Sequence, residues 1–186
     1  VLNTSSDILS EKDVRIALQH ATNKQNISDG IFYGLEKPAD TLFASTVPYC
    51  DIELEPYVYD LELAGQILDE AGWKMGSGNV REKDGQPLNI DLLYNSDSVT
   101  EKSIAEYLQS EYQSIGVSLN IHGEEEQSYR DNMKAGNFDM VFNICWGTPY
   151  DPQSSLAAMR APVYGDYAAQ LGLDDKAEID DAITEI

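Results

Sequence analysis

The amino-acid sequence predicts an α/β fold in which helices flank a mainly parallel central sheet. Three apolar segments resemble strands, and they are separated by segments in which apolar residues recur at helical spacing. The resulting order, β-α-β-α-β, implies parallel strands joined by right-handed crossovers. The chain has 186 residues, 42% of them hydrophobic, so we expect one domain with one core.

The first predicted element is a helix that begins near residue 10. Residues 10–13 (Ser-Glu-Lys-Asp) have the spacing of a capping box. Residues 34–59 then contain three prolines and no sustained period, which predicts a long connection over the surface. The apolar residues of the first helix fall on one face: Val14, Ala17, Leu18 and Ala21.

A second helix is predicted between Asp60, whose carboxylate can cap it, and Gly72, which supplies a left-handed stop. Residues 76–79 favour a turn, and the two glycines there complete no phosphate-binding motif. The buried stripe of this helix comprises Leu61, Ala64, Ile67, Leu68 and Ala71.

The first two strands are predicted from apolar residues that alternate with polar ones. The first strand begins at Leu88, and a helix then runs from about Thr100 to Ile115, where Gly116 ends it. The alternating residues are Leu88, Ile90 and Leu92 in the first strand and Val117, Leu119 and Ile121 in the second.

A fourth helix leads into the third strand, which completes the predicted sheet. The acidic residues 124–126 favour a helix start because carboxylates complement the helix dipole, and Tyr129 and Met133 occupy its inner side before Gly136. Residues from Asp139 to Cys145 are apolar on both faces of the predicted strand. We therefore expect this strand at the centre of the sheet.

Two helices are predicted in the C-terminal part, a short one near residues 154–160 and an amphipathic one over residues 174–186. The apolar stripe of the last helix reaches Ile186, and the first residue, Val1, is not an initiator Met. We therefore interpret the chain as part of a longer protein in which the last helix packs on structure outside this sequence.

The charge balance limits the classes of partner. The chain has 33 acidic and 12 basic residues and a formal net charge of −21, so nucleic acids and anionic membranes repel it at long range. No run of eighteen apolar residues is present, and the sequence predicts no membrane span.

The cysteines and histidines form no recognisable metal-binding pattern. Cys50 and Cys145 lack zinc-site spacing, and a disulfide between them stays open. His122 beside the acidic residues 124–126 is a possible metal site, although a solvated loop is favoured. No nucleophile motif such as GxSxG occurs. We therefore predict no enzyme, no resident metal and no cofactor.

A loop rich in aromatic residues follows the third predicted strand. Loops at the carboxyl ends of parallel strands converge on a crevice, which is the usual ligand site of such sheets. Trp146 and Tyr150 each offer a large rigid ring with one polar group, which suits binding a ligand without transforming it. Closing the edge of the core is the alternative role for these two rings.

Four blocks of the sequence resemble the family-5 extracellular solute-binding proteins, which include the nickel-, dipeptide- and oligopeptide-binding components of ABC importers. The similarity extends from residue 11 to about residue 185, and the last block is most similar to the nickel-binding branch. The blocks are residues 13–18 (DVRIAL), residues 59–73 (ending LLxEAGW in the family and ILDEAGW here), residues 81–88 and residues 122–160.

The resemblance implies one lobe of a type II periplasmic-binding-protein-like clamp, with the ligand between two lobes. It also implies ligand contacts from Trp146, Tyr150, Arg160 and Tyr164. Peptide-binding members commonly place an Asp three positions after the Trp to hold the peptide ammonium, and Pro149 occupies that position here. Tyr164 stands where some nickel-binding members have a metal-ligating His, and a neutral phenol is a poor nickel ligand.

The resemblance therefore predicts a solute-binding component of an ABC importer that captures nickel as a small-chelator complex. Binding of a peptide or another small solute, or a role as the ligand-sensing lobe of a regulator, are the alternatives. The expected partners are a small-molecule ligand and the permease subunits. The expected location is extracytoplasmic, in the periplasm or at the outer face of the cell membrane, with membrane attachment only through a lipid anchor or the transporter.

Overall fold

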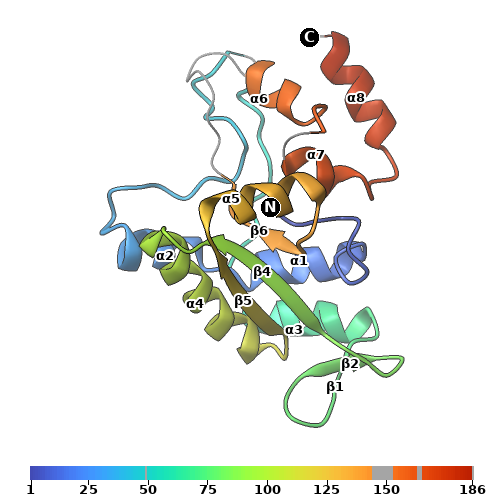
Figure 1. The fold of residues 1–186 in the computed structure, drawn as a ribbon. Helices are drawn as coiled ribbons and strands as arrows, with labels where there is room; N and C mark the ends of the chain where they lie inside the picture. The colour runs from blue at the N-terminus through green and yellow to red at the C-terminus, as the bar shows by residue number, and fades with distance from the viewer. Residues whose placement is uncertain (49, 144–152, 163–164, 186) are drawn as a thin grey trace.

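The computed structural model describes residues 1–186 except residue 49, residues 144–152, residues 163–164 and residue 186. Figure 1 shows helices on both sides of a small sheet. The elements are α1 (Lys12–His20), α2 (Lys24–Ile31), α3 (Leu61–Glu70), β1 (Lys74–Met75), β2 (Arg81–Lys83), β3 (Gln86–Pro87), β4 (Asn89–Asn95), α4 (Val99–Ser114), β5 (Ser118–Glu124), α5 (Glu126–Ala135), β6 (Met140–Val141), α6 (Gln153–Ala158), α7 (Gly165–Gln170) and α8 (Lys176–Glu185).

The main sheet has the order β5-β4-β6, and both pairings are parallel. Leu92 of β4 lies opposite Ile121 on one side and Met140 on the other. The predicted α/β fold with a parallel sheet is confirmed. The predicted position of the third strand is wrong, because β4 and not β6 is the middle strand.

The amino-terminal residues extend the sheet beyond β6, which the sequence did not predict. Leu2 forms an antiparallel bridge with Met140, and the backbone N–H of Asn3 donates to the carbonyl of Asp139 at 2.8 Å. The side-chain amide of Asn3 also donates to the carbonyl of Phe138 at 2.8 Å. These bonds satisfy the edge of β6 that faces away from β4.

Apolar side chains cover both faces of the sheet and form two clusters. The larger cluster joins one face of β4 and β5 to α1, α3 and α4, and it contains Ile90, Leu92 and Leu119. The smaller cluster joins Leu93 and Val141 to α5 and α7 on the opposite face. Alternate residues of a strand point to opposite faces, so Leu92 and Leu93 belong to different clusters. The result is a three-layer α/β/α arrangement.

The predicted capping box at residue 10 is wrong. Helix α1 is preceded by Glu11, whose side chain makes no capping hydrogen bond. The hydroxyl of Ser10 instead donates to the carbonyl of Asp7 at 2.9 Å, because residues 6–10 already form a turn. Arg15 stabilises this turn by donating to the carbonyl of Leu9 at 2.7 Å.

The start of α3 and the ends of two helices agree with the sequence. The carboxylate of Asp60 accepts from the backbone N–H of Leu63 at 2.9 Å, as an N-cap does. Gly116 and Gly136 follow α4 and α5 with positive φ angles of 82° and 73°. Short helices were harder to predict: α2 and α7 have few large apolar residues, so too few positions mark a buried stripe.

Within the described ranges of the chain, no helix combines the length and apolar character that crossing a membrane requires. The α8 stripe predicted from the sequence contains Ile179 and Ile183, which are half-buried. The remaining stripe residue, Ile186, lies outside the described residues. That α8 packs on structure outside this chain stays a prediction.

Candidate functional site

The carboxyl ends of β4, β5 and β6 meet at one edge of the sheet, which we call the carboxyl edge. The last strand residues are Asn95, Glu124 and Val141. The chain continues from β6 through Phe142 and Asn143 into residues 144–152. This is the edge at which ligands bind in open parallel sheets.

Polar side chains tie the ends of β4 and β5 to the helices that follow them. The backbone N–H of Asn95 donates to the Glu101 carboxylate at 2.8 Å, and the Asn95 side-chain amide donates to Glu126. Glu124 accepts from Ser128 Oγ at 2.5 Å and from Asn132 Nδ2 at 2.7 Å. These bonds fix the first turns of α4 and α5 at the carboxyl edge.

The end of β6 is held by side chains from α5 and α7. The phenol of Tyr129, which is buried, donates to the carbonyl of Phe142. The side-chain amide of Asn143 donates to the carboxylate of Asp166 at 2.6 Å. The structure therefore positions the chain up to Asn143, directly before the loop that the sequence singles out.

Burial and nearby carboxylates shift the pKa values of the ionisable side chains at this edge. Burial raises the pKa of Glu101, and the nearby charge of Glu126 raises it further, while the hydrogen bond from Asn95 lowers it. Burial raises the pKa of Asp166, and the hydrogen bond from Asn143 opposes that shift. Burial is the main reason why the pKa of Tyr129 is raised, and the negative charges of Glu101 and Glu126 raise it further. Its phenol therefore remains a hydrogen-bond donor.

Replacing Glu101 with Gln is expected to stabilise the chain at pH 7 by about 0.5 kcal/mol, a value reduced by solvent screening. Because the pKa of Glu101 is raised in the folded state, its ionisation destabilises the folded chain at pH values above its ordinary pKa of 4.5. At pH 3.5 the carboxyl is protonated in both states and the difference is expected to disappear. Urea unfolding of the two proteins at both pH values measures this difference, and equal stability at pH 7 would contradict it.

Of the four predicted ligand residues, the structure describes the position of Arg160. It follows α6, its side chain is exposed, and no acidic side chain among the described residues pairs with it. Trp146, Tyr150 and Tyr164 lie outside the described residues. Cys145 also lies outside them, so a disulfide between Cys50 and Cys145 stays open. The ligand contacts therefore stay predictions.

The acidic residues after His122 do not converge on its ring. His122 Nε2 lies 3.2 Å from Asp91 Oδ1, on an exposed part of the sheet. Glu124 is bonded to α5, and Glu126 pairs with Arg130. In the part of the chain that the structure describes, no three side chains of His, Cys, Asp or Glu are grouped to hold a metal ion.

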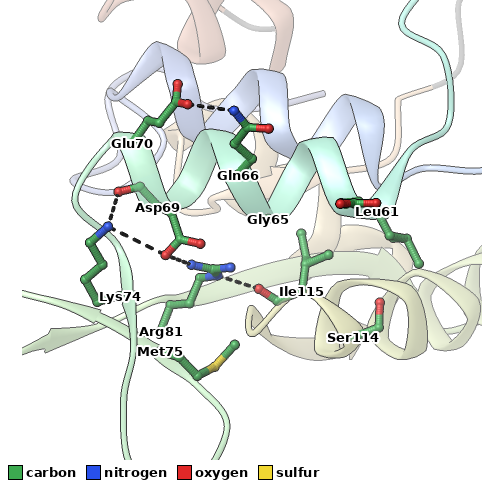
Figure 2. A pocket seen from close by; sticks show the side chains of 11 residues that line it. Leu61, Gly65, Gln66, Asp69, Glu70, Lys74, Met75, Arg81, Ser114 and Ile115 are labelled. Atoms are coloured by element: carbon green, nitrogen blue, oxygen red, sulfur yellow. Dashed lines mark hydrogen bonds and ion pairs between the residues drawn. The ribbon is translucent and has the colours of Figure 1, made fainter.

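A cavity of about 490 Å³ lies at the opposite edge of the sheet, between α3, β1 and the end of α4. Figure 2 shows the Arg81 guanidinium beside Asp69, with Gly65 of α3 above it. Arg81 donates to Asp69 Oδ1 at 2.9 Å and to the carbonyls of Ile115 and Trp73, each at 2.7 Å. These bonds join three elements, so we assign this cavity a structural role.

Sequence reasoning missed the polar residues of the carboxyl edge. Asn95 and Glu124 carry a usable signal, because each lies three positions after the last alternating apolar residue of a predicted strand, Leu92 and Ile121. Glu101 was also detectable, since Ser98 and Glu101 have the spacing of a capping box and Ser98 caps α4. Asp166 had no such signal, because α7 was not predicted.

Comparison with known proteins places the chain among solute-binding proteins. The family described as "Bacterial extracellular solute-binding proteins, family 5 Middle" matches residues 1–166. The nickel-binding periplasmic protein of Escherichia coli (strain K12) is 42% identical over 186 residues, covering 100% of this chain and 36% of that protein. The oligopeptide-binding protein OppA of Lactococcus lactis subsp. cremoris (strain SK11) is 27% identical over 95% of this chain and 31% of its own length.

A solved structure supports the same grouping. The structure of NikA from Brucella suis in complex with Fe(III)-EDTA matches with a TM-score of 0.94 and 46% sequence identity. The match covers 99% of this chain and 37% of that one. The chain thus spans about a third of the length of these relatives.

Proposed function

The chain belongs to the family-5 bacterial extracellular solute-binding proteins, and on that premise we propose that its parent protein captures nickel as a small-chelator complex for an ABC importer. This chain supplies one lobe of the clamp. Its family is extracytoplasmic and consists of solute-binding proteins, so the proposed activity is binding and delivery to permease subunits, without catalysis.

The place of two aromatic residues in the sequence, shortly after Asn143, carries the proposal. Asn143 is held at the carboxyl edge by Asp166, and Trp146 and Tyr150 follow within seven residues. Because they follow Asn143 so closely in the sequence, we expect both rings at that edge, where they would offer flat apolar contact and two polar groups to an organic ligand. The exposed Arg160 can bind a chelator carboxylate through paired N–H groups.

The nickel assignment rests on similarity and on one substitution. The relative with 42% identity is a nickel-binding protein, and the solved relative with 46% identity contains a metal chelate. Tyr164 is a poor direct nickel ligand, which favours a metal already enclosed by a chelator.

Peptide capture is the second candidate, because the oligopeptide-binding protein OppA is similar over 95% of this chain. Pro149 stands where peptide-binding members commonly carry the Asp that pairs with the peptide ammonium. Burying an ammonium without a counter-charge costs several kcal/mol. Nickel chelate is therefore the ligand we favour.

The proposal is tested by calorimetric titration of the full-length parent protein with nickel alone, with nickel plus histidine, and with mixed di- and tripeptides. Heat of binding only when nickel and histidine are both present supports the proposal. Binding of peptides without nickel would refute the nickel assignment and leave the family membership intact.

Replacing Trp146 with Ala in the parent protein is expected to weaken binding of the nickel–histidine complex by about tenfold to a hundredfold, the usual effect of losing a buried aromatic contact. Met75→Ala is the matched control, because Met75 is exposed on β1 near the opposite edge of the sheet. Equal affinity of the Trp146 variant and the control would show that the ring closes the core instead of contacting the ligand.

A further inference from the structure

Large apolar side chains are exposed along the connection between α2 and α3, residues 34–59, which we call the connecting segment. Seven of the thirteen exposed large hydrophobic residues of the described chain lie in it. A folded surface rarely leaves so many apolar side chains together in water unless another surface covers them. The seven are Leu35, Leu42, Ile52, Leu54, Tyr57, Val58 and Tyr59.

The connecting segment is fixed where it meets the helices. At its start, the Lys24 ammonium pairs with Asp40 at 2.9 Å and donates to the carbonyl of Ala39 at 3.1 Å. At its end, the His20 ring bonds the carbonyl of Val58 at 2.7 Å. Both ends of the connecting segment, the long loop between α2 and α3 in Figure 1, are therefore held in place.

Two further contacts hold the end of the segment. Tyr57 packs edge-on against His20, with ring centroids 5.4 Å apart. The phenol of Tyr59 donates to the Glu111 carboxylate of α4 at 2.5 Å. Both rings thus fix the segment on α1 and α4, upstream of the cap of α3.

The middle of the segment has a two-sided pattern. Residues 51–55 alternate acidic and apolar side chains, and Ile52 and Leu54 are 63% and 59% exposed. In an extended chain, alternate side chains point to opposite sides, so the carboxylates and the apolar groups separate. Within the described part of the chain, no backbone N–H of residues 51–59 donates a hydrogen bond. The alternation therefore predicts one apolar side, and within the described residues the backbone N–H groups of this stretch bond no acceptor.

We propose that the connecting segment is the surface on which the other lobe of the parent protein packs, with Ile52 and Leu54 facing that lobe. This proposal rests on the two-lobed clamp of the proposed function. Two of the relatives are nearly three times as long as this chain, which covers 36% and 37% of them. A large part of the parent thus lies outside this sequence and is available to cover the segment.

Hydrogen exchange of the full-length parent, measured by mass spectrometry, tests the proposal. Covered amides in residues 51–58 are expected to exchange at least about tenfold more slowly than unprotected ones. The double variant Ile52→Ser and Leu54→Ser is expected to remove that protection. The matched control, Asp51→Ser and Glu53→Ser, changes the same stretch on its acidic side and is expected to keep it.

Three outcomes would overturn the assignment. The first is exchange of these amides at the unprotected rate in the parent, and the second is an equal loss of protection in both double variants. Protection that disappears on dilution would assign the surface to a second copy of the protein. Nickel–histidine binding is measured separately, so a failure of the proposed ligand leaves the exchange result unaffected.

Discussion

Replacing Arg81 with Met is expected to destabilise the chain by about 3–5 kcal/mol, the cost of removing one partner of a buried polar network. Arg81 is buried, and its guanidinium donates to the backbone carbonyls of Ile115 and Trp73. Each buried carbonyl left without a donor costs about 1–3 kcal/mol. Met has a suitable length but offers no hydrogen-bond donor. Chemical denaturation measures the loss.

The ion pair with Asp69 contributes much less than the two carbonyls. The Asp69 side chain is 49% exposed, so solvent screens the pair. Asp69→Asn is therefore the matched control, and we expect it to cost less than about 1 kcal/mol. A similar loss in both variants would show that the ion pair, and not the carbonyl bonds, is the stabilising interaction.

The pH dependence of the Asp69 control has a definite sign. The hydrogen bond from Arg81 is the main reason why the pKa of Asp69 is lowered from its ordinary value of 3.8. Because the pKa is lower in the folded state, the ionised carboxylate stabilises the folded chain at pH values above 3.8. This stabilisation is lost as the pH falls through the folded pKa. The difference between wild type and Asp69→Asn should therefore shrink on acidification.

The sequence predicted the elements whose pattern depends on one buried face. Ile90 and Leu92 alternate in β4 and are both buried, and the stripe of α3 includes the buried Ala64 and Leu68. These patterns are local, because a strand or helix of fixed period must place them on one side. Elements without a large apolar stripe were missed, as the small buried residues of α7 show.

The arrangement of the strands could not be predicted completely. The apolar character of the third strand suggested a central position. Burial of β6 comes partly from residues 1–3, which form hydrogen bonds with the edge of β6 that faces away from β4. That pairing joins positions about 140 residues apart, and no local period reports it. The same limit applies to the carboxyl edge, where the partner of Asn143 is Asp166 on an unpredicted helix.

Replacing Gly172 with Ala is expected to destabilise the chain by about 3 kcal/mol or more, as overpacking against rigid backbone does. A Cβ at this position would overlap the backbone carbonyl of Thr4 and lie 2.8 Å from the N atom of Ser5. Thr4 is itself fixed, because its N–H and its hydroxyl both donate to the carbonyl of Ala169, at 2.8 and 2.5 Å. The backbone of residues 4–5 therefore cannot move without breaking these bonds.

Gly30→Ala is the matched control for that substitution. Gly30 lies in α2, where an added Cβ would meet no atom within 4 Å. Alanine in an open helical position is expected to stabilise the chain by about 0.5–1 kcal/mol, so the two glycine variants should shift the thermal midpoint in opposite directions. Because residues 1–3 bond the free edge of β6, displacement of Thr4 should also loosen β6. Faster hydrogen exchange at Val141 in the Gly172 variant alone would confirm that coupling, whereas unchanged exchange would confine the damage to the contact with α7.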